Sequence, residues 1–239
     1  MSSSAGTEAL QQAFEHCRDL DGSLADQLAA FVDAVHRLTP DFAEAVERLV
    51  ARLRQNGSGN GAPQPGDPMP RFLLPDEEGH LVGLEELLAS GPVAVAFNRG
   101  HWCPYCRISI RALARVHAEL AAIGGKVVAI VPESQQFAAE FKSDAGASFP
   151  ILTDLDNGYA LSLNLAVWVG AEMERLMGAR GRDLPRYQGN DAWILPIPAT
   201  FVVGGDGIIA ARFVDPDYRR RMAIEDLLAA LRGARRQIS

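Results

Sequence analysis

Two of the three cysteines in the chain, Cys103 and Cys106, stand three positions apart in the segment 97–106. A thiolate is a strong nucleophile, and a second thiol one helical turn away can attack a sulfur-linked intermediate formed on the first. The pair therefore predicts thiol redox chemistry, with Cys103 as the nucleophile and Cys106 as the resolving cysteine.

The residues around the pair predict how it is held. An apolar run, Val93–Phe97, precedes the cysteines, and apolar residues at helical spacing follow them. Pro104 suits the first position of a helix, because the N–H that it lacks has no helical partner there. Cys103 would then be the N-cap, where free backbone N–H groups and the helix dipole favour a thiolate. Such a position lowers the pKa of a cysteine below its free value of about 8.5.

Other roles for the cysteines are less favoured. A disulfide between residues three apart closes too small a loop to constrain the unfolded chain much. A zinc site needs more ligands at paired spacings than Cys17, His101 and His117 offer, so no metal is predicted. Two unreactive core cysteines would leave Pro104 and the following helix unexplained. Cys17 lies on an apolar helical stripe and is interpreted as a buried structural thiol, with a remote resolving cysteine as the alternative.

The composition of the 239-residue chain limits its partners. A net charge of −7 and a pI near 5.3 argue against nucleic acid or an anionic membrane surface. No apolar run approaches the ~20 residues of a membrane span, and the start of the chain lacks the basic and apolar regions of a secretory signal. We therefore expect a cytoplasmic protein, in a compartment where thiols stay reduced and a cysteine pair is catalytic.

Sequence patterns divide the chain into three parts. Residues 1–55 are predicted to be an N-terminal extension of three amphipathic helices, which must pack on the remaining chain or on a second copy, so a homodimer is one expectation. Residues 56–70 are rich in Gly and Pro and indicate a linker. Residues 71–239 predict an α/β fold with a mixed central sheet flanked by helices. Within them, residues 166–196 read as a surface insertion or as one wall of the substrate cleft.

The last third of the chain predicts a β-hairpin followed by a helix. The strands are expected at Ile197–Val203 and Ile208–Phe213, on either side of a glycine-rich turn. The final helix is expected to begin at or near Asp217. Arg219–Arg221 are expected to be solvated charges and not a binding patch.

The segment from about Gly66 to Leu231 resembles the peroxiredoxin-like branch of the thioredoxin superfamily, the alkyl hydroperoxide reductase/thiol-specific antioxidant group. The resemblance rests on blocks in the expected order: Gly66-Asp67 with Pro70, Arg99–Cys106, Val131–Ser134, Phe149–Asn157 and Pro196–Tyr218. It implies a thioredoxin-like fold and a thiol-dependent peroxidase that needs no cofactor besides its cysteine pair. It also implies a peroxide substrate and a reductant of the thioredoxin or glutathione type.

The resemblance assigns supporting residues around the cysteines as well. It makes Pro198 a cis-proline that faces the sulfurs, with Thr200 in the strand that Pro198 enters. Trp102, Pro104 and Tyr105 complete the cysteine turn, Trp102 chiefly through packing. The sequence Cys-Pro-Tyr-Cys is also similar to the glutaredoxin site, which would act on a disulfide substrate.

Two departures from typical peroxiredoxins leave other functions open. Gly100 replaces the Thr or Ser that stands three residues before the peroxidatic cysteine, and no arginine stands near the strand that Pro198 enters. Both groups orient peroxide and stabilise developing charge. Arg99 is a candidate to replace the arginine, and His101 to add positive charge near Cys103. The alternatives are a thioredoxin- or glutaredoxin-like disulfide reductase and a non-enzymatic redox sensor whose cysteine state controls how the N-terminal helices dock.

Overall fold

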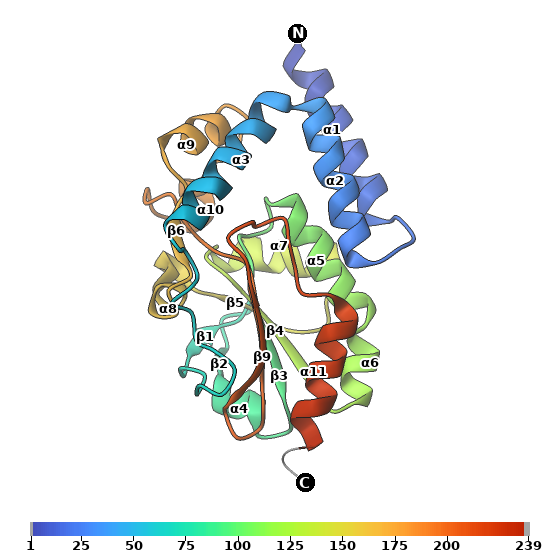
Figure 1. Ribbon diagram of the computed structural model, residues 1–239, viewed down its shortest axis with the longest axis vertical. Helices are drawn as coiled ribbons and strands as arrows, with labels where there is room; N and C mark the ends of the chain where they lie inside the picture. Colours follow the sequence, from blue (N-terminus) through green and yellow to red (C-terminus); the bar gives the residue numbers. More distant parts are fainter. Residues whose placement is uncertain (1, 237–239) are drawn as a thin grey trace.

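A five-stranded mixed sheet forms the centre of the computed structural model, which describes residues 2–236 (Figure 1). The strand order is β5-β4-β3-β8-β9. Strands β3, β4 and β5 run parallel, and β8 and β9 are antiparallel to their neighbours. The strands are β3 (Val93–Phe97), β4 (Lys126–Val131), β5 (Ile151–Thr153), β8 (Ala199–Val203) and β9 (Ile209–Val214). The predicted mixed sheet is thus confirmed.

Alternate residues of β3 face two separate cores, as the period of a strand requires. Val93, Val95 and Phe97 join one core with α4 (Leu84–Leu88). Ala94 and Ala96 face the other core, where their small side chains leave room for helices on the sheet. The helices that contribute to this second core are α5 (Pro104–Arg115), α6 (His117–Ala122), α7 (Gln135–Ala145) and α11 (Ile224–Arg236).

Two small antiparallel sheets of two strands each accompany the central sheet. The first joins β1 (Leu73–Pro75) to β2 (Leu81–Gly83). The second joins β6 (Ala166–Trp168) to β7 (Ile194–Pro196) and encloses α9 (Ala171–Gly178) and α10 (Leu184–Gln188). The 3₁₀ turn η1 (Leu155–Asn157) and α8 (Gly158–Ser162) directly precede β6 in the chain.

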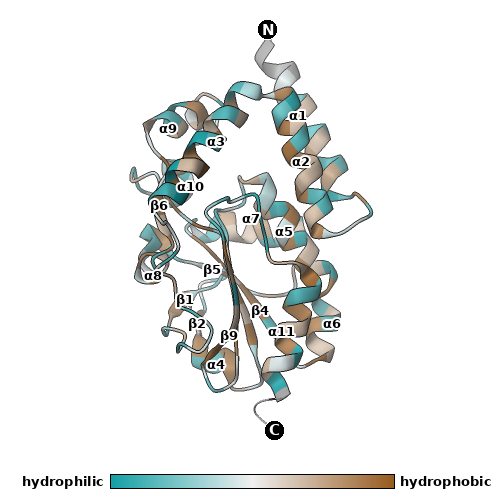
Figure 2. Ribbon diagram, viewed as in Figure 1, coloured by the Kyte–Doolittle hydropathy of each residue, from teal (hydrophilic) through white to brown (hydrophobic). Residues whose placement is uncertain are grey.

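Three helices precede the sheet, as predicted: α1 (Ser2–Arg18), α2 (Leu24–Leu38) and α3 (Pro40–Gln55). A reciprocal capping box between Ser23 and Asp26 begins α2. The three helices lie beyond one end of the sheet, with α4 at the opposite end (Figure 1), and their hydrophobic residues alternate with hydrophilic ones along each helix (Figure 2). Their apolar residues share one core with α5. No helix within residues 2–236 is long and apolar enough to cross a membrane.

The Gly- and Pro-rich segment 56–70 runs along β9. The N–H of Gly66 donates to the carbonyl of Ile209 at 2.9 Å, and the N–H of Ile209 donates to the carbonyl of Asp67 at 2.9 Å. Met69 is buried, and its N–H donates to the carbonyl of Gly207 at 2.9 Å. These bonds fix the second half of the segment to the edge of the sheet.

The region before the last helix differs from the prediction. Helix α11 begins at Ile224 and not near Asp217. The loop between β9 and α11 instead carries Arg219, whose guanidinium pairs with Asp217 at 2.7 Å and with Glu47 of α3 at 2.5 Å. The expectation of a solvated arginine run is therefore wrong for Arg219 and Arg221, because both guanidinium groups have partners distant in the sequence.

Candidate active site

The cysteine turn joins the end of β3 to the start of α5. Cys103 is the N-cap of α5, with extended backbone angles, and Pro104 is the first helical residue, as predicted. Gly100 has a φ of +129°, a backbone region that favours glycine. A Cβ on Gly100 would also lie 2.5 Å from the carboxyl group of Glu133. Gly100 is therefore required by the local backbone and by its close approach to Glu133.

The two cysteines lie 3.6 Å apart and are both free and buried. The Cys106 sulfur accepts two hydrogen bonds, one from the backbone N–H of Arg99 at 3.3 Å and one from the Arg221 guanidinium at 3.3 Å. A guanidinium that donates to a sulfur favours the thiolate form of that sulfur. The pair is thus close enough to react with each other and has donors directed at Cys106.

The first proton leaves Cys103. Burial raises the pKa of this thiol, but its hydrogen bond with Cys106 and the positive charges of Arg99 and Arg221 outweigh burial and lower the pKa to about 5. Burial raises the pKa of Cys106 well above its ordinary value, and the hydrogen bond to Cys103 and the negative charge of Cys103 raise it further. Cys103 is therefore a thiolate near neutral pH, and Cys106 keeps its proton while Cys103 is ionised.

Arg99 is buried beside aromatic rings. Its guanidinium carbon lies 3.8 Å from the centroid of the Tyr218 ring and 5.0 Å from that of Trp102. Tyr218 in turn packs edge-on against Tyr105, with ring centroids 5.6 Å apart. Cation–π contacts of this kind stabilise a buried guanidinium in an apolar site. Arg182 adds a half-buried guanidinium, which donates to the carbonyl of Trp102 at 2.5 Å.

Glu133 follows β4 and lies beneath the cysteine turn. Its carboxylate accepts a hydrogen bond from the N–H of His101 at 2.7 Å. Burial raises the pKa of Glu133 to about 8, although the N–H groups of His101 and Trp102 oppose this shift. The other carboxyl oxygen of Glu133 is buried with no hydrogen-bond partner in the described part of the chain. The group is therefore mostly protonated at neutral pH.

Three predicted site residues lie away from the sulfurs or differ in geometry. The ring of His101 pairs with Asp144 of α7 at 2.6 Å and faces that helix. Thr200 is half-buried in β8, opposite Ala96 of β3. The prediction of a cis-proline at Pro198 is wrong, because residues 2–236 contain no cis peptide bond. Pro198 lines a small cavity next to Arg99, separate from the one that Cys103 lines.

Cys103 lines a cavity of about 40 Å³. One part of the wall comes from the N-terminal helices, another from the segment 166–196, and the rest from the cysteine turn and the loop after β9. The lining residues include Phe31, Val35, Phe42, Met177, Arg180 and Arg182. The segment 166–196 thus contributes a wall of this cavity.

Four residues near the cysteines were not identified from the sequence as part of the site: Glu133, Arg182, Tyr218 and Arg221. Glu133 stands in a block that carries the family resemblance, and its acidic type after a buried strand is a usable signal. Tyr218 likewise ends the Pro196–Tyr218 block of the resemblance. Arg182 and Arg221 gave no local signal, because the contacts that bring them to the cysteine turn join residues far apart in the chain.

The chain is similar to proteins of one known family. The AhpC/TSA family matches residues 65–212. A Mycobacterium tuberculosis protein that bears a peroxiredoxin name is 31% identical over 150 residues, which are 62% of this chain and 84% of that protein.

Solved structures support the same fold. Peroxidoxin BcpB from Mycobacterium tuberculosis aligns with a TM-score of 0.55 at 21% identity, over 71% of this chain and 97% of that one. A yeast mitochondrial 1-Cys peroxiredoxin aligns with a TM-score of 0.55 at 16% identity, over 70% of this chain and 73% of that one. Together with the family match, these likenesses assign a thioredoxin-like fold. The chain therefore belongs to the AhpC/TSA family and is an oxidoreductase of the thiol-dependent peroxidase class.

Proposed function

We propose that the protein is a dithiol peroxidase in which Cys103 reduces a hydroperoxide and Cys106 resolves the product. The observation that carries the proposal is the pair itself. The two cysteines lie 3.6 Å apart, the pKa of Cys103 is lowered to about 5, and a guanidinium donates to Cys106. The cysteines supply all the electrons, so the proposal includes no metal or organic cofactor.

In the first step the Cys103 thiolate attacks the terminal oxygen of the peroxide. The S–O bond forms as the O–O bond breaks, so the sulfur is oxidised to a sulfenic acid and the peroxide leaves as an alkoxide or hydroxide, which takes up a proton. Arg99 and Arg182 lie around the cavity and carry positive charge toward the oxygen that leaves.

In the second step Cys106 attacks the sulfenic sulfur of Cys103 and releases hydroxide, which becomes water. Oxidation removes the negative charge of Cys103, and that charge is one of the causes that raise the pKa of Cys106. The donors from Arg221 and from the Arg99 backbone then favour the Cys106 thiolate. The resolving cysteine is thus activated once the first step is complete.

In the third step an external dithiol or two monothiols reduce the internal disulfide by thiol–disulfide exchange. Attack at the Cys103 sulfur expels Cys106 as a thiolate, which the hydrogen bond from the Arg221 guanidinium stabilises. We assign the reductant to the thioredoxin or glutathione type and the reaction to the cytoplasm, where such thiols are maintained.

Stopped-flow oxidation of the reduced protein tests this function. We expect hydrogen peroxide to oxidise the protein in a second-order reaction that consumes two thiols per peroxide. Insulin and glutathione disulfide serve as competing substrates, because Cys-Pro-Tyr-Cys and Gly100 favour a disulfide reductase. Negligible reaction with peroxides beside rapid turnover of either disulfide would replace the peroxidase with that alternative.

A further inference from the structure

The N-terminal helices cover the reactive cysteine. The residues that match the family begin at residue 65, whereas α1, α2 and α3 lie before that point. Phe31 of α2 packs edge-on against Tyr105 of the cysteine turn, with ring centroids 5.1 Å apart. Cys103 is 1% exposed. A segment outside the matched part of the chain therefore closes the entrance to the site.

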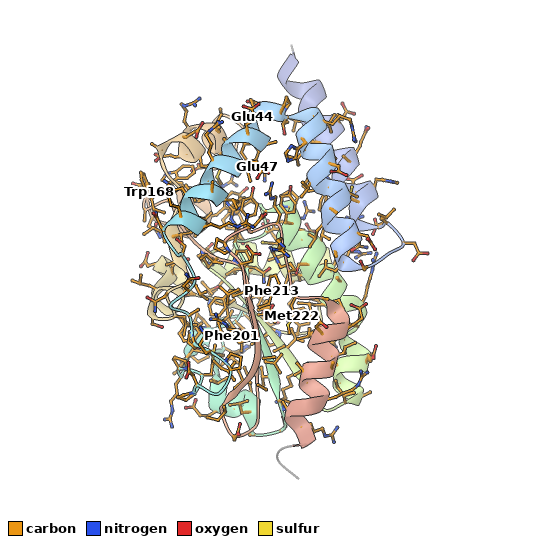
Figure 3. The ribbon with its side chains drawn as sticks, in the orientation of Figure 1. Glu44, Glu47, Trp168, Phe201, Phe213 and Met222 are labelled. Atoms are coloured by element: carbon orange, nitrogen blue, oxygen red, sulfur yellow. The ribbon has the colours of Figure 1, made fainter. Side chains whose placement is uncertain are left out.

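Ion pairs hold this cover on the redox unit. Asp41 of α3 pairs with Arg180 at 2.8 Å. Glu47, labelled on α3 in Figure 3, pairs with Arg219 at 2.5 Å. A third pair joins Arg48 of α3 to a carboxylate of α9 at 2.8 Å. Apolar packing and ion pairs thus both hold α3 beside the cavity.

The space left under the cover is small. A cavity needs about 10–15 Å³ to hold one water molecule, and the cavity at Cys103 measures about 40 Å³. A molecule the size of hydrogen peroxide fits such a space, whereas a peroxide that carries a phenyl ring does not. Val35 of α2 and Phe42 of α3 stand in the wall and reduce the volume.

We infer that Val35 and Phe42 are specificity-determining residues, which make the oxidative step selective for hydrogen peroxide and comparably small hydroperoxides over bulky ones. This inference rests on the proposed peroxidase function and deepens it. The selectivity is steric: a bulky hydroperoxide must displace α2 or α3 before its oxygen reaches the Cys103 sulfur. The same cover excludes a protein disulfide until the helices move.

The test compares hydrogen peroxide with cumene hydroperoxide in single-turnover oxidation of the full chain. We expect the wild type to react at least about 100-fold faster with hydrogen peroxide. Val35→Ala and Phe42→Leu should each raise the ratio of the cumene hydroperoxide rate to the hydrogen peroxide rate by about 10-fold, because each removes methyl- or ring-sized volume from the wall. Phe42 is only half-buried, so its variant tests the inference even if Val35→Ala folds poorly.

Val32→Ala is the matched control, since it makes the same substitution one turn away on α2. Val32 lines a different groove, beside Arg219 and Arg220, and not the cavity at Cys103. The ratio of the two rates in Val32→Ala should equal that of the wild type. Equal rates with both peroxides in the wild type, or an unchanged ratio in both cavity variants, would overturn the inference.

A second measurement needs no peroxidase activity. Labelling of Cys103 by methyl methanethiosulfonate, a small reagent, is compared with labelling by the bulky aromatic disulfide DTNB, with peptide mass spectrometry as the readout. We expect the small reagent to be strongly preferred and the preference to fall in Val35→Ala and Phe42→Leu. If the small reagent is preferred but no peroxide reacts, the proposed peroxidase function is wrong and the size selectivity of the cavity is supported. If both reagents label Cys103 equally, the size selectivity is wrong and the peroxidase function is unaffected.

Discussion

Residues 65–212 and the segments on either side of them contribute differently to one site. The matched part holds both cysteines, the Arg99 charge and the buried Glu133. The flanking segments supply the cover through Phe31 and the guanidinium at Cys106 through Arg221. The reactive group therefore belongs to the part shared with the family, whereas access to it and the tuning of its partner sulfur come from segments outside that part.

The largest expected effect is in the matched part. Cys103→Ser should abolish peroxide reduction, a loss of at least about 1,000-fold, because a hydroxyl is not ionised at neutral pH. Cys106→Ser should react once with peroxide and then accumulate sulfenic acid or a mixed disulfide, visible by mass spectrometry. Cys17→Ser, at a buried thiol of α1, is the control and should cycle normally. Activity that survives in Cys103→Ser and disappears in Cys106→Ser would reverse the two roles.

A smaller effect is expected in the flanking segment at Arg221. Arg221→Gln should slow the reduction of the internal disulfide by dithiothreitol by about 10- to 100-fold, the range expected for a lost hydrogen bond to a charged group. Arg220→Gln is the control, because Arg220 is exposed and pairs with Asp215 at 2.8 Å. Equal rates in the two variants would show that tuning of Cys106 does not need this guanidinium.

The rate at which Cys103 is alkylated should depend on pH. The pKa of about 5 predicts that alkylation of Cys103 is flat above about pH 6 and falls about tenfold for each unit below pH 5, as the thiolate is protonated. Thiolate absorbance near 240 nm reports the same transition, and Cys103→Ser should lack it. A midpoint near that of a free thiol, about 8.5, would show that the charges of Arg99 and Arg221 do not lower the pKa of Cys103.

The remaining expected effect is on stability and concerns Glu133. Its pKa is raised from 4.5 to about 8 in the folded protein, so the folded state keeps a proton that the unfolded state loses between these values. The stabilisation is fully present below pH 4.5 and is lost as the pH rises through 8. In this window Glu133 makes the free energy of unfolding fall by up to about 1.4 kcal/mol per pH unit.

Denaturant unfolding of Glu133→Gln from pH 5 to pH 8 measures this contribution. The variant should show a shallower decline than the wild type, because an amide does not titrate. Glu85→Gln, at an exposed carboxylate of α4, should retain the wild-type slope. Identical slopes in all three proteins would mean that Glu133 is ionised in the folded state.

The elements around the cysteines could be predicted because their signals are local. Strand β3 begins and ends with the apolar run Val93–Phe97, and Pro104 begins α5. The prediction of a helix that begins at or near Asp217, after β9, was wrong. Asp217 instead pairs with Arg219, which also reaches Glu47 of α3, and no local pattern contains that partner.

The fold class, the three N-terminal helices and the cysteine pair at a helix start follow from local patterns, because periodicity, capping residues and spacing act over a few positions. The closure of α2 over Cys103 and the hydrogen bond that Arg221 donates to Cys106 arise from tertiary packing. These contacts join residues 74 and 115 positions apart. They depend on how whole elements pack, and burial there changes the charge state and the accessibility of a sulfur in ways that spacing does not encode.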